Sequence, residues 1–257
     1  MLDRITNLVR EAGEIVLNAS DILSRTHIKT SAADLVTEYD VAVENFLKER
    51  LLQLMPEAIF YGEEEKENQD PSRGWAFIVD PIDGTTNFVR GFRQSAISVA
   101  LAKDGQVEYA VVYDPYKNEM FTAQRGCGAF CNGKPIHVSP LPMSQGVFGV
   151  GTALYRREYL QPTMRIVTQL MERSCDLRRF AAAALDLCNV ACGRLEAFFE
   201  YSLSPWDYAA GSLIITEAGG KICTMQGKPL PITERCSVWC ANSVCFDVLQ
   251  ELDVIDF

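Results

Sequence analysis

Apolar residues repeat every three or four positions at the start of the chain, which is the spacing of an amphipathic helix. The repeat runs from Leu2 to Leu23 and predicts one helix over that range. A second helix is expected after Thr37, which reads as an N-cap with Asp40 at N3, followed by apolar positions as far as Leu54. Two antiparallel helices therefore open the predicted fold.

Short apolar runs with the length of β-strands follow in the middle of the chain. They predict a strand at 59–62 and four more at 75–79, 96–102, 107–113 and 119–123. The pair Asp104-Gly105 separates two of these runs and is a hairpin signal. The first half of the chain is therefore expected to combine a helix pair with β-hairpins.

Helical and strand patterns alternate in the second half. Strands are expected near 147–151 and 197–200, and helices near 160–173, 181–192 and 206–218. The segment Pro140-Leu141-Pro142 is the best candidate boundary. It divides the chain into an N-terminal α+β subdomain at 1–140 and a C-terminal α/β subdomain at 141–257. Hairpins in one half and βα alternation in the other predict an α/β fold built as a layered sandwich.

Composition and charge exclude some classes of protein. The chain has 257 residues with 24 Lys and Arg against 34 Asp and Glu, a formal charge of −10, whereas a nucleic-acid binder shows a basic surface. No apolar stretch reaches the roughly 18 residues of a membrane span, and no secretory or transit signal is evident. We therefore expect a cytoplasmic protein with no nucleic-acid or membrane partner.

Cysteine and histidine usage narrows the chemistry. None of the nine cysteines forms a Cys-x-x-Cys pair, so we expect reduced, mostly buried thiols, with Cys188 and Cys192 acting as small apolar residues in a helix. The histidines are His27 and His137, and neither lies in a recognisable nucleophile or metal motif. An enzyme this poor in histidine must rely on carboxylates, thiols or hard metal ions.

Two carboxylates follow the apolar run at 75–79, where the predicted strand ends. Asp80 and Asp83 are separated by a proline turn, and Gly84, Thr85 and Thr86 can then open a helix. Carboxylate oxygens at a strand end suit Mg²⁺, which keeps waters and a substrate phosphate in its coordination shell. The backbone N–H groups of the three residues after Asp83 would bind that phosphate.

Each acid in this region also has a purely structural explanation. Asp80 and Asp83 can be turn and N-cap residues, and the cluster Glu63 to Glu67 can be a solvated loop. Asp40 and Asp207 both stand three residues after an N-cap candidate, so each can complete a capping box. These explanations suffice for each acid alone, but the string that begins at Asp80 is unusual and three further acidic motifs accompany it.

Five segments resemble, in order and spacing, the successive signatures of the inositol monophosphatase family. They lie at 34–40, 62–64, 80–88, 206–211 and 217–220 and so span nearly the whole chain. The resemblance implies Mg²⁺-dependent hydrolysis of a phosphomonoester, inhibition by lithium, and a homodimer. It also implies an αβαβα sandwich of the type shared with fructose-1,6-bisphosphatase.

Matching these segments residue by residue implies the roles of individual groups. The resemblance makes five groups ligands of two or three Mg²⁺ ions: Glu63, Asp80, Asp83, Asp207 and the backbone carbonyl of Ile82. The implied catalytic set is Asp40, Thr85 and Glu63, of which the first two orient the attacking water. Lys29 corresponds to the family's lysine near the metals. The implied substrate contacts are Gly84, Thr85, Thr86, Ala183, Asp207 and Glu200, the last through substrate hydroxyls.

The match weakens before the helix expected at 181–192. Family members often carry Arg-x-Gly-Ser/Thr-Ala-Ala here, whereas this chain has Ala181-Ala182 in place of the Gly-Ser/Thr pair. The change removes the conformational freedom of glycine and a hydroxyl, so it can narrow the pocket or delete a hydrogen bond. Arg178 and Arg179 have two readings, binding of a second phosphate or pairing with surface acids.

The leading hypothesis is an inositol-1-monophosphatase-like enzyme that hydrolyses inositol monophosphate or a similar polyol or sugar phosphate by metal-activated water. Fructose-1,6-bisphosphatase, histidinol-phosphatase and 3′-phosphoadenosine 5′-phosphate phosphatase activities compete with it, because the fold alone does not separate them. The alternative from another class is a catalytically silent, metal-binding regulatory subunit.

Overall fold

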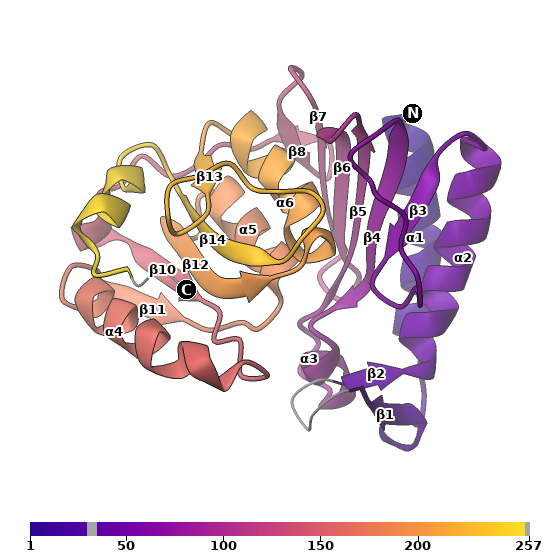
Figure 1. The fold of residues 1–257 in the computed structure, drawn as a ribbon, viewed down its shortest axis with the longest axis horizontal. Helices are drawn as coiled ribbons and strands as arrows, with labels where there is room; N and C mark the ends of the chain where they lie inside the picture. The colour runs from indigo at the N-terminus through magenta and orange to yellow at the C-terminus, as the bar shows by residue number, and fades with distance from the viewer. Residues whose placement is uncertain (30–34, 255–257) are drawn as a thin grey trace.

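The computed structural model describes residues 1–29 and 35–254. The elements stack in five layers, in which helices alternate with two β-sheets (Figure 1). The αβαβα sandwich expected from the sequence is therefore confirmed. The first family-like segment begins outside the described residues, because its Asp34 belongs to 30–34.

The first layer consists of two antiparallel helices, α1 (Leu2–Leu17) and α2 (Glu38–Leu54), on the outer face of the first sheet (Figure 1). The prediction of one helix over 2–23 is wrong in its second part. The Asn18 side chain donates to the Glu14 carbonyl oxygen at 2.8 Å, and Asp21 has a left-handed φ of 52°. The helix therefore stops at Leu17, and a 3₁₀ turn, η1 (Ile22–Arg25), follows a break.

The second layer is a seven-stranded sheet with the spatial order β3-β4-β5-β6-β7-β8-β9. The pair β3 and β4 is parallel and the other pairs are antiparallel. Asp104 and Gly105 both have positive φ, 49° and 79°, in the hairpin predicted between β5 and β6. The strands are β3 (Ile59–Gly62), β4 (Trp75–Asp83), β5 (Ala96–Lys103), β6 (Gln106–Asp114), β7 (Glu119–Gln124), β8 (Ala129–Cys131) and β9 (Lys134–Pro135).

Two short elements adjoin the first sheet. A two-stranded ribbon, β1 (Thr26–Ile28) and β2 (Leu35–Thr37), precedes α2. The short helix α3 (Thr85–Val89) follows β4 directly, with Gly84 at its N-cap in the left-handed region at φ 86°. A Cβ on Gly84 would lie 3.0 Å from the Gln94 carbonyl oxygen, so both φ and space favour glycine here.

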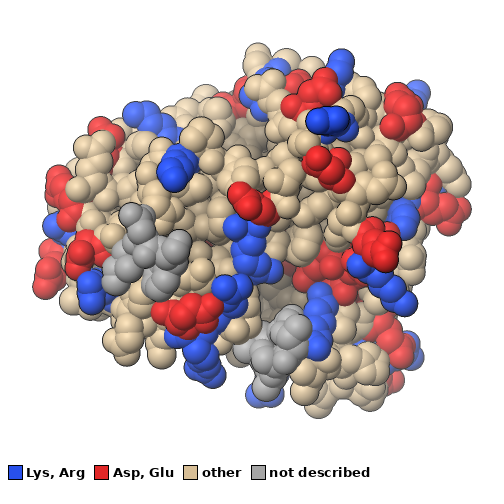
Figure 2. All heavy atoms as spheres, viewed as in Figure 1, with Lys and Arg blue, Asp and Glu red and all other residues tan. Residues whose placement is uncertain are grey.

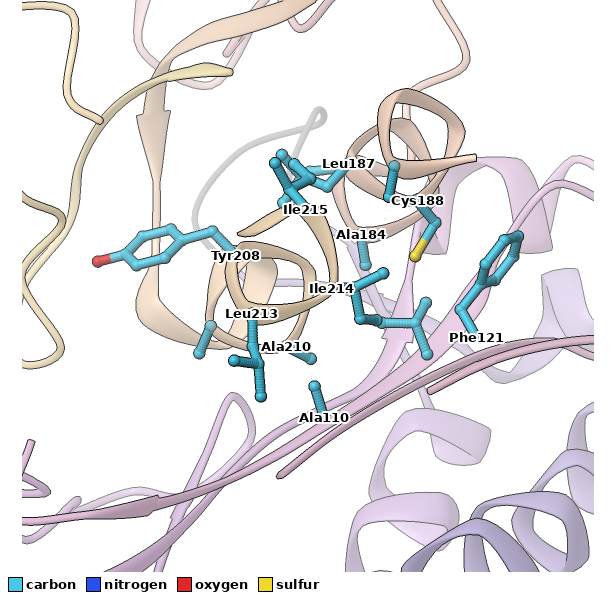
Figure 3. Close-up of a cluster of buried hydrophobic side chains, with 14 of the residues drawn as sticks. Ala110, Phe121, Ala184, Leu187, Cys188, Tyr208, Ala210, Leu213, Ile214 and Ile215 are labelled. Carbon is cyan, nitrogen blue, oxygen red and sulfur yellow. The ribbon is translucent and has the colours of Figure 1, made fainter. Parts of the chain in front are cut away.

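The middle layer contains α5 (Ala183–Ala191) and α6 (Pro205–Glu217), each within two residues of its expected range. Both helices are apolar around most of their circumference because they lie between the two sheets. A Cβ on Gly211 would lie 2.6 Å from Leu187, so the glycine lets the two helices approach closely. Figure 3 shows side chains of both helices in one apolar cluster, with Leu187 of α5 near Ile215 of α6, and with Ala110 and Phe121 of the first sheet.

The fourth layer is a five-stranded sheet of order β11-β10-β12-β14-β13, in which β10 is parallel to both neighbours. Its strands are β10 (Val147–Val150), β11 (Asp176–Arg178), β12 (Ala197–Leu203), β13 (Lys221–Cys223) and β14 (Cys236–Ala241). Its outer face packs against the last layer, which holds α4 (Leu160–Met171) and η4 (Phe246–Glu251). The remaining 3₁₀ turns are η2 (Met143–Gln145) and η3 (Arg157–Tyr159).

The division into two subdomains at Pro140–Pro142 stays a prediction. In the structure, one apolar core runs from the first sheet through α5 and α6 to the second sheet. All nine cysteines are free, but only four are buried, so the expectation of mostly buried thiols is wrong. Cys188 is buried as expected, whereas Cys192 is partly exposed. Within the residues that the structure describes, no helix is long and apolar enough to cross a membrane.

Candidate active site

A cavity of ≈ 450 Å³ opens between the C-terminal end of β4, the start of α5 and the loop after β10. This volume suits a small-molecule site. Figure 2 shows a hollow in the middle of this face of the molecule, with charged side chains along it. The sequence-predicted residues that line the cavity are Glu63, Asp83, Gly84, Thr85, Thr86, Ala183, Glu200 and Asp207. The predicted residues Asp40, Asp80 and Ile82 are buried.

Strand β4 delivers Asp80 and Asp83 to the site, and both carboxylates are anchored by backbone donors. Asp80 Oδ1 accepts from Ile82 N at 3.0 Å, which is the turn interaction anticipated for it. Asp83 Oδ1 and Oδ2 accept from Ala183 N at 3.1 Å and Ala184 N at 2.7 Å. Asp83 therefore caps α5, a helix about a hundred residues further along the chain, rather than its own helix.

Asp207 and Glu63 reach the site from two other elements. Asp207 completes the predicted capping box of α6, where it accepts from Ser204 N at 2.7 Å. Glu63 directly follows β3, and its Oε1 lies 2.9 Å from Lys29 Nζ, which also donates to Glu64 at 2.5 Å. Lys48 pairs with Glu65 of the same loop at 2.7 Å, so the acidic loop is held by two lysines and is not simply solvated.

These carboxylates interact unfavourably with one another. Burial, together with the charges of Glu63, Asp83 and Asp207, raises the pKa of Asp80 well above its ordinary value. Burial and the charge of Glu63 raise the pKa of Asp207 to about 7. Burial opposes the charge on Lys29, but the two glutamates outweigh it and raise its pKa. The site therefore carries more negative charge than its single lysine balances.

The donor set fits a hard divalent cation. The four acids and the Ile82 carbonyl offer oxygen atoms only, which is the ligand type of Mg²⁺. Among residues 1–29 and 35–254, no three Asp, Glu, Cys or His side chains already converge as a metal cage. The carboxylates of Asp80 and Asp207 each have one oxygen bonded to a backbone N–H, and the two side chains also interact with each other.

Thr85 links the acidic cluster to α2. Its hydroxyl lies 3.3 Å from Asp40 Oδ1 and 3.1 Å from the Ile82 carbonyl oxygen. The other oxygen of Asp40 accepts from Thr37 N at 2.8 Å and completes the capping box of α2. Burial raises the pKa of Asp40 to about 6, while the bonds from Thr37 lower it. Asp40 thus has both its predicted structural role and a direct contact to the predicted catalytic hydroxyl.

Comparison with known proteins decides the family. The model of the inositol monophosphatase family matches residues 1–252. The chain belongs to the inositol monophosphatase family. An inositol-1-monophosphatase of Rhizobium meliloti is 38% identical over 221 residues, which cover 86% of this chain and 83% of the relative. The Nus factor SuhB of Xylella fastidiosa is 34% identical over 252 residues, covering 95% of this chain and 91% of the relative.

A solved structure shares the fold closely. The extragenic suppressor protein SuhB of Bartonella henselae superimposes with a TM-score of 0.90 at 30% identity, over 97% of this chain and 96% of the other. Relatives of similar sequence identity thus have two different names: one is called an inositol-1-monophosphatase and the other a Nus factor. Membership makes phosphatase chemistry plausible and leaves the substrate open.

The place where the chain departs from the inositol monophosphatase pattern is strained. Ala181, in the position of the family glycine, has a left-handed φ of 60°. The Asn87 side chain fixes this turn by donating to the carbonyl oxygens of Phe180 at 2.6 Å and Ala181 at 3.3 Å. Ala182 is the N-cap of α5 and makes no capping bond, so Asp83 takes over that task. The backbone thus keeps the left-handed turn that a glycine would adopt freely.

The loop at 151–155 contributes to the cavity and carries no sequence motif that could have identified it. Ala153 N donates to Glu200 Oε1 at 2.9 Å, and Ala153 has a positive φ of 39°. A Cβ on Gly151 would lie 1.8 Å from Glu200 Oε2, so Gly151 lets this carboxylate sit against the loop. Burial raises the pKa of Glu200 to about 7. The predicted substrate acid is therefore held in place by the loop.

Of the two roles considered for Arg178 and Arg179, pairing with a surface acid applies to the first, and a position at the cavity applies to the second. Arg178 forms a surface ion pair with Asp176 at 2.6 Å. Arg179 lines the cavity, and its Nε donates to Thr152 Oγ1 at 2.9 Å. A further cation, Arg235, also lines the cavity and was not anticipated, because it lies in no recognisable motif.

Proposed function

We propose that this member of the inositol monophosphatase family is a Mg²⁺-dependent phosphomonoesterase that hydrolyses inositol monophosphate or a similar polyol or sugar phosphate. The observation that carries the proposal is the cluster of Glu63, Asp80, Asp83 and Asp207, four carboxylates from β4, α6 and the loop after β3. Burial and mutual repulsion raise the pKa values of Asp80, Asp83 and Asp207. Such a cluster is stabilised by cations, and a bound cation in turn attracts a phosphate.

Bound at this cluster, two or three Mg²⁺ ions would neutralise charge on the phosphate and make a coordinated water more acidic. We assign the orientation of that water to Thr85 and Asp40. The Thr85 hydroxyl has one proton, so when it donates to Asp40 its lone pairs are free to accept from the water. Asp40, with its pKa near 6, is then the group that can share the proton that the water loses.

The rest of the cavity supports a role in substrate binding. Gly84, the N-cap of α3, and the first helical residues Thr85 and Thr86 line the cavity, so their backbone N–H groups can bind a phosphate there. Glu200 keeps acceptor capacity beyond its bond from Ala153 N, which suits a substrate hydroxyl. Ala183 lines the same wall with a small side chain that leaves room for a substrate.

The names of some relatives support the alternative of a non-enzymatic regulatory protein. A relative called a Nus factor is named for something other than phosphatase activity, which agrees with a metal-binding regulatory protein. The expectations of lithium inhibition, a homodimer, a cytoplasmic location and no nucleic-acid partner stay predictions. The retained contact between Thr85 and Asp40 favours the enzyme, because a silent relative has no need of a positioned hydroxyl beside the cluster.

The test is phosphate release from a panel containing inositol 1-phosphate, fructose 1,6-bisphosphate, histidinol phosphate and 3′-phosphoadenosine 5′-phosphate. We expect turnover in Mg²⁺, none with a chelator, and loss of about 100-fold or more in kcat for Asp83→Asn. Asp70→Asn, a change at an exposed turn, is the matched control and should leave the rate unchanged. Metal binding without turnover of any compound would instead support the regulatory protein.

A further inference from the structure

Two arginines line the cavity on the side of the loop at 151–155. Arg179 follows β11, and its Nε donates to Thr152 Oγ1 at 2.9 Å. Arg235 precedes β14, and its Nη1 donates to the Tyr155 hydroxyl at 2.7 Å, with its guanidinium stacked over the Tyr155 ring at 5.2 Å. Each guanidinium is therefore positioned by a different residue of the same loop.

Both arginines keep donors available for a ligand. Each side chain is exposed, and within the described part of the chain neither forms an ion pair. Each guanidinium has five N–H donors, and each has one short hydrogen bond to a neutral oxygen of the loop. The loop thus orients the two groups without neutralising them.

The two arginines lie within electrostatic range of buried acids but form no ion pair with them in the described part of the chain. The one acid that the loop holds is Glu200, and its pKa is lowered by the charges of both Arg179 and Arg235 while burial raises it. Burial also raises the pKa values of Asp207 and Asp186, which the charges of Arg235 and Arg179, respectively, lower. A second hollow of ≈ 640 Å³ continues from Arg235 and adds Lys228 and Arg156, and Figure 2 shows basic side chains gathered beside the central hollow.

The metal-ligand candidates come from elements other than those that carry the arginines. Glu63 follows β3, Asp83 ends β4 and Asp207 belongs to the first turn of α6, whereas the arginines are anchored to the loop after β10. A substrate whose phosphate lies at the acids would extend its remaining atoms toward the arginines. A neutral polyol offers only hydroxyls there and leaves the arginines without an anionic partner.

We propose that the preferred substrate is a bisphosphorylated sugar or polyol, with Arg179 and Arg235 binding the phosphate that is not hydrolysed. This inference rests on the proposed function and deepens it by naming the substrate class. Guanidinium groups present paired donors that match phosphate oxygens. Among the described residues neither guanidinium is held in an ion pair, so both can bind that second phosphate.

The test compares fructose 1,6-bisphosphate with fructose 1-phosphate in Mg²⁺. We expect the wild-type kcat/KM to be higher for the bisphosphate, and Arg179→Gln and Arg235→Gln each to lower the ratio of the two kcat/KM values by about tenfold. Arg178→Gln is the matched control, because Arg178 pairs with Asp176 on the surface. It should leave the ratio unchanged.

Three results would overturn the inference: equal kcat/KM values for the two sugars, an equal loss on both sugars in the arginine variants, or the same change in the control. An equal loss would mean that the arginines serve the scissile phosphate. Calorimetric binding of both sugars separates this from failure of the proposed function. If no phosphate is released but wild type binds the bisphosphate more tightly and both variants lose that preference, the arginine site stands and the phosphatase proposal fails.

Discussion

Ala181 adopts a backbone conformation that costs free energy for any residue with a Cβ. Its φ of 60° is left-handed, and the bonds from Asn87 hold the turn in place. The left-handed cost of about 1–2 kcal/mol exceeds the entropic cost of glycine, about 0.5–1 kcal/mol. Ala181→Gly should therefore raise the free energy of unfolding by about 0.5–1 kcal/mol in urea denaturation.

The same substitution in a helical backbone is the control for Ala181. Ala184→Gly, within α5, should lower the free energy of unfolding, because glycine is the poorer helix former and the buried methyl group is lost. Equal losses for the two variants would contradict the account of strain at Ala181.

The proposed role of Thr85 depends on its hydroxyl and not on its shape. Thr85→Val keeps the shape and removes the contacts to Asp40 and the Ile82 carbonyl. We expect its kcat to fall by about 100-fold, while Thr85→Ser retains most of the activity. Similar kcat values for Thr85→Val and the wild type would remove the hydroxyl from the mechanism.

At the scale of elements, the close contact of α5 with α6 depends on Gly211. An alanine Cβ at Gly211 would lie 2.6 Å from Leu187, so one helix must move. Gly211→Ala should lower the free energy of unfolding by about 1–3 kcal/mol. Ser212→Ala, on the neighbouring position of α6, should change it by less than about 0.5 kcal/mol. Melting temperatures of the two variants check this, and equal values would contradict it.

Local signals predicted the helices better than they predicted where each helix is capped. The capping boxes of α2 and α6 were readable because their partners lie three residues apart. The end of α1 was missed, because the apolar spacing continues past Asn18 although the helical backbone ends at Leu17. The cap of α5 comes from Asp83, which only the folded chain brings to Ala183 and Ala184.

For the whole molecule, buried acids in and near the acidic cluster make stability depend on pH. The pKa values of Glu44, Glu200 and Asp207 are raised to about 7, in each case chiefly by burial. Between the ordinary pKa of these acids and about 7, the folded chain holds more protons than the unfolded chain, so stability falls as pH rises. The metal-free protein should therefore melt at a higher temperature at pH 5.5 than at pH 8.

Mg²⁺ should offset this loss of stability, because a ligand that binds only the folded chain stabilises it. We expect added Mg²⁺ to raise the melting temperature at pH 8 more than at pH 5.5, where protons compete for the carboxylates. A melting temperature that rises with pH in chelator, or the same response to Mg²⁺ at both pH values, would contradict the electrostatic account.

The candidate site was predictable where its residues lie in contiguous motifs. Asp80, Asp83 and Gly84 belong to one short segment at the end of a strand. Their proximity therefore follows from the local sequence and needs no knowledge of the tertiary structure. Arg235 and the loop at 151–155 could not be predicted, because only the packing of the second sheet against α5 and α6 brings them to the cavity. Sequence therefore indicated the phosphate chemistry and said much less about the rest of the substrate.

The most direct test of the central claim is a Mg²⁺ titration of phosphate release from inositol 1-phosphate by the wild type and Asp80→Asn. Asp80 is buried among the other acids, and asparagine keeps its shape while removing its charge. We predict saturable activation by Mg²⁺ for the wild type, and for Asp80→Asn a higher half-saturating concentration with a kcat lower by about 100-fold. Phosphate release that persists in chelator, or the same Mg²⁺ dependence in both proteins, would contradict the claim.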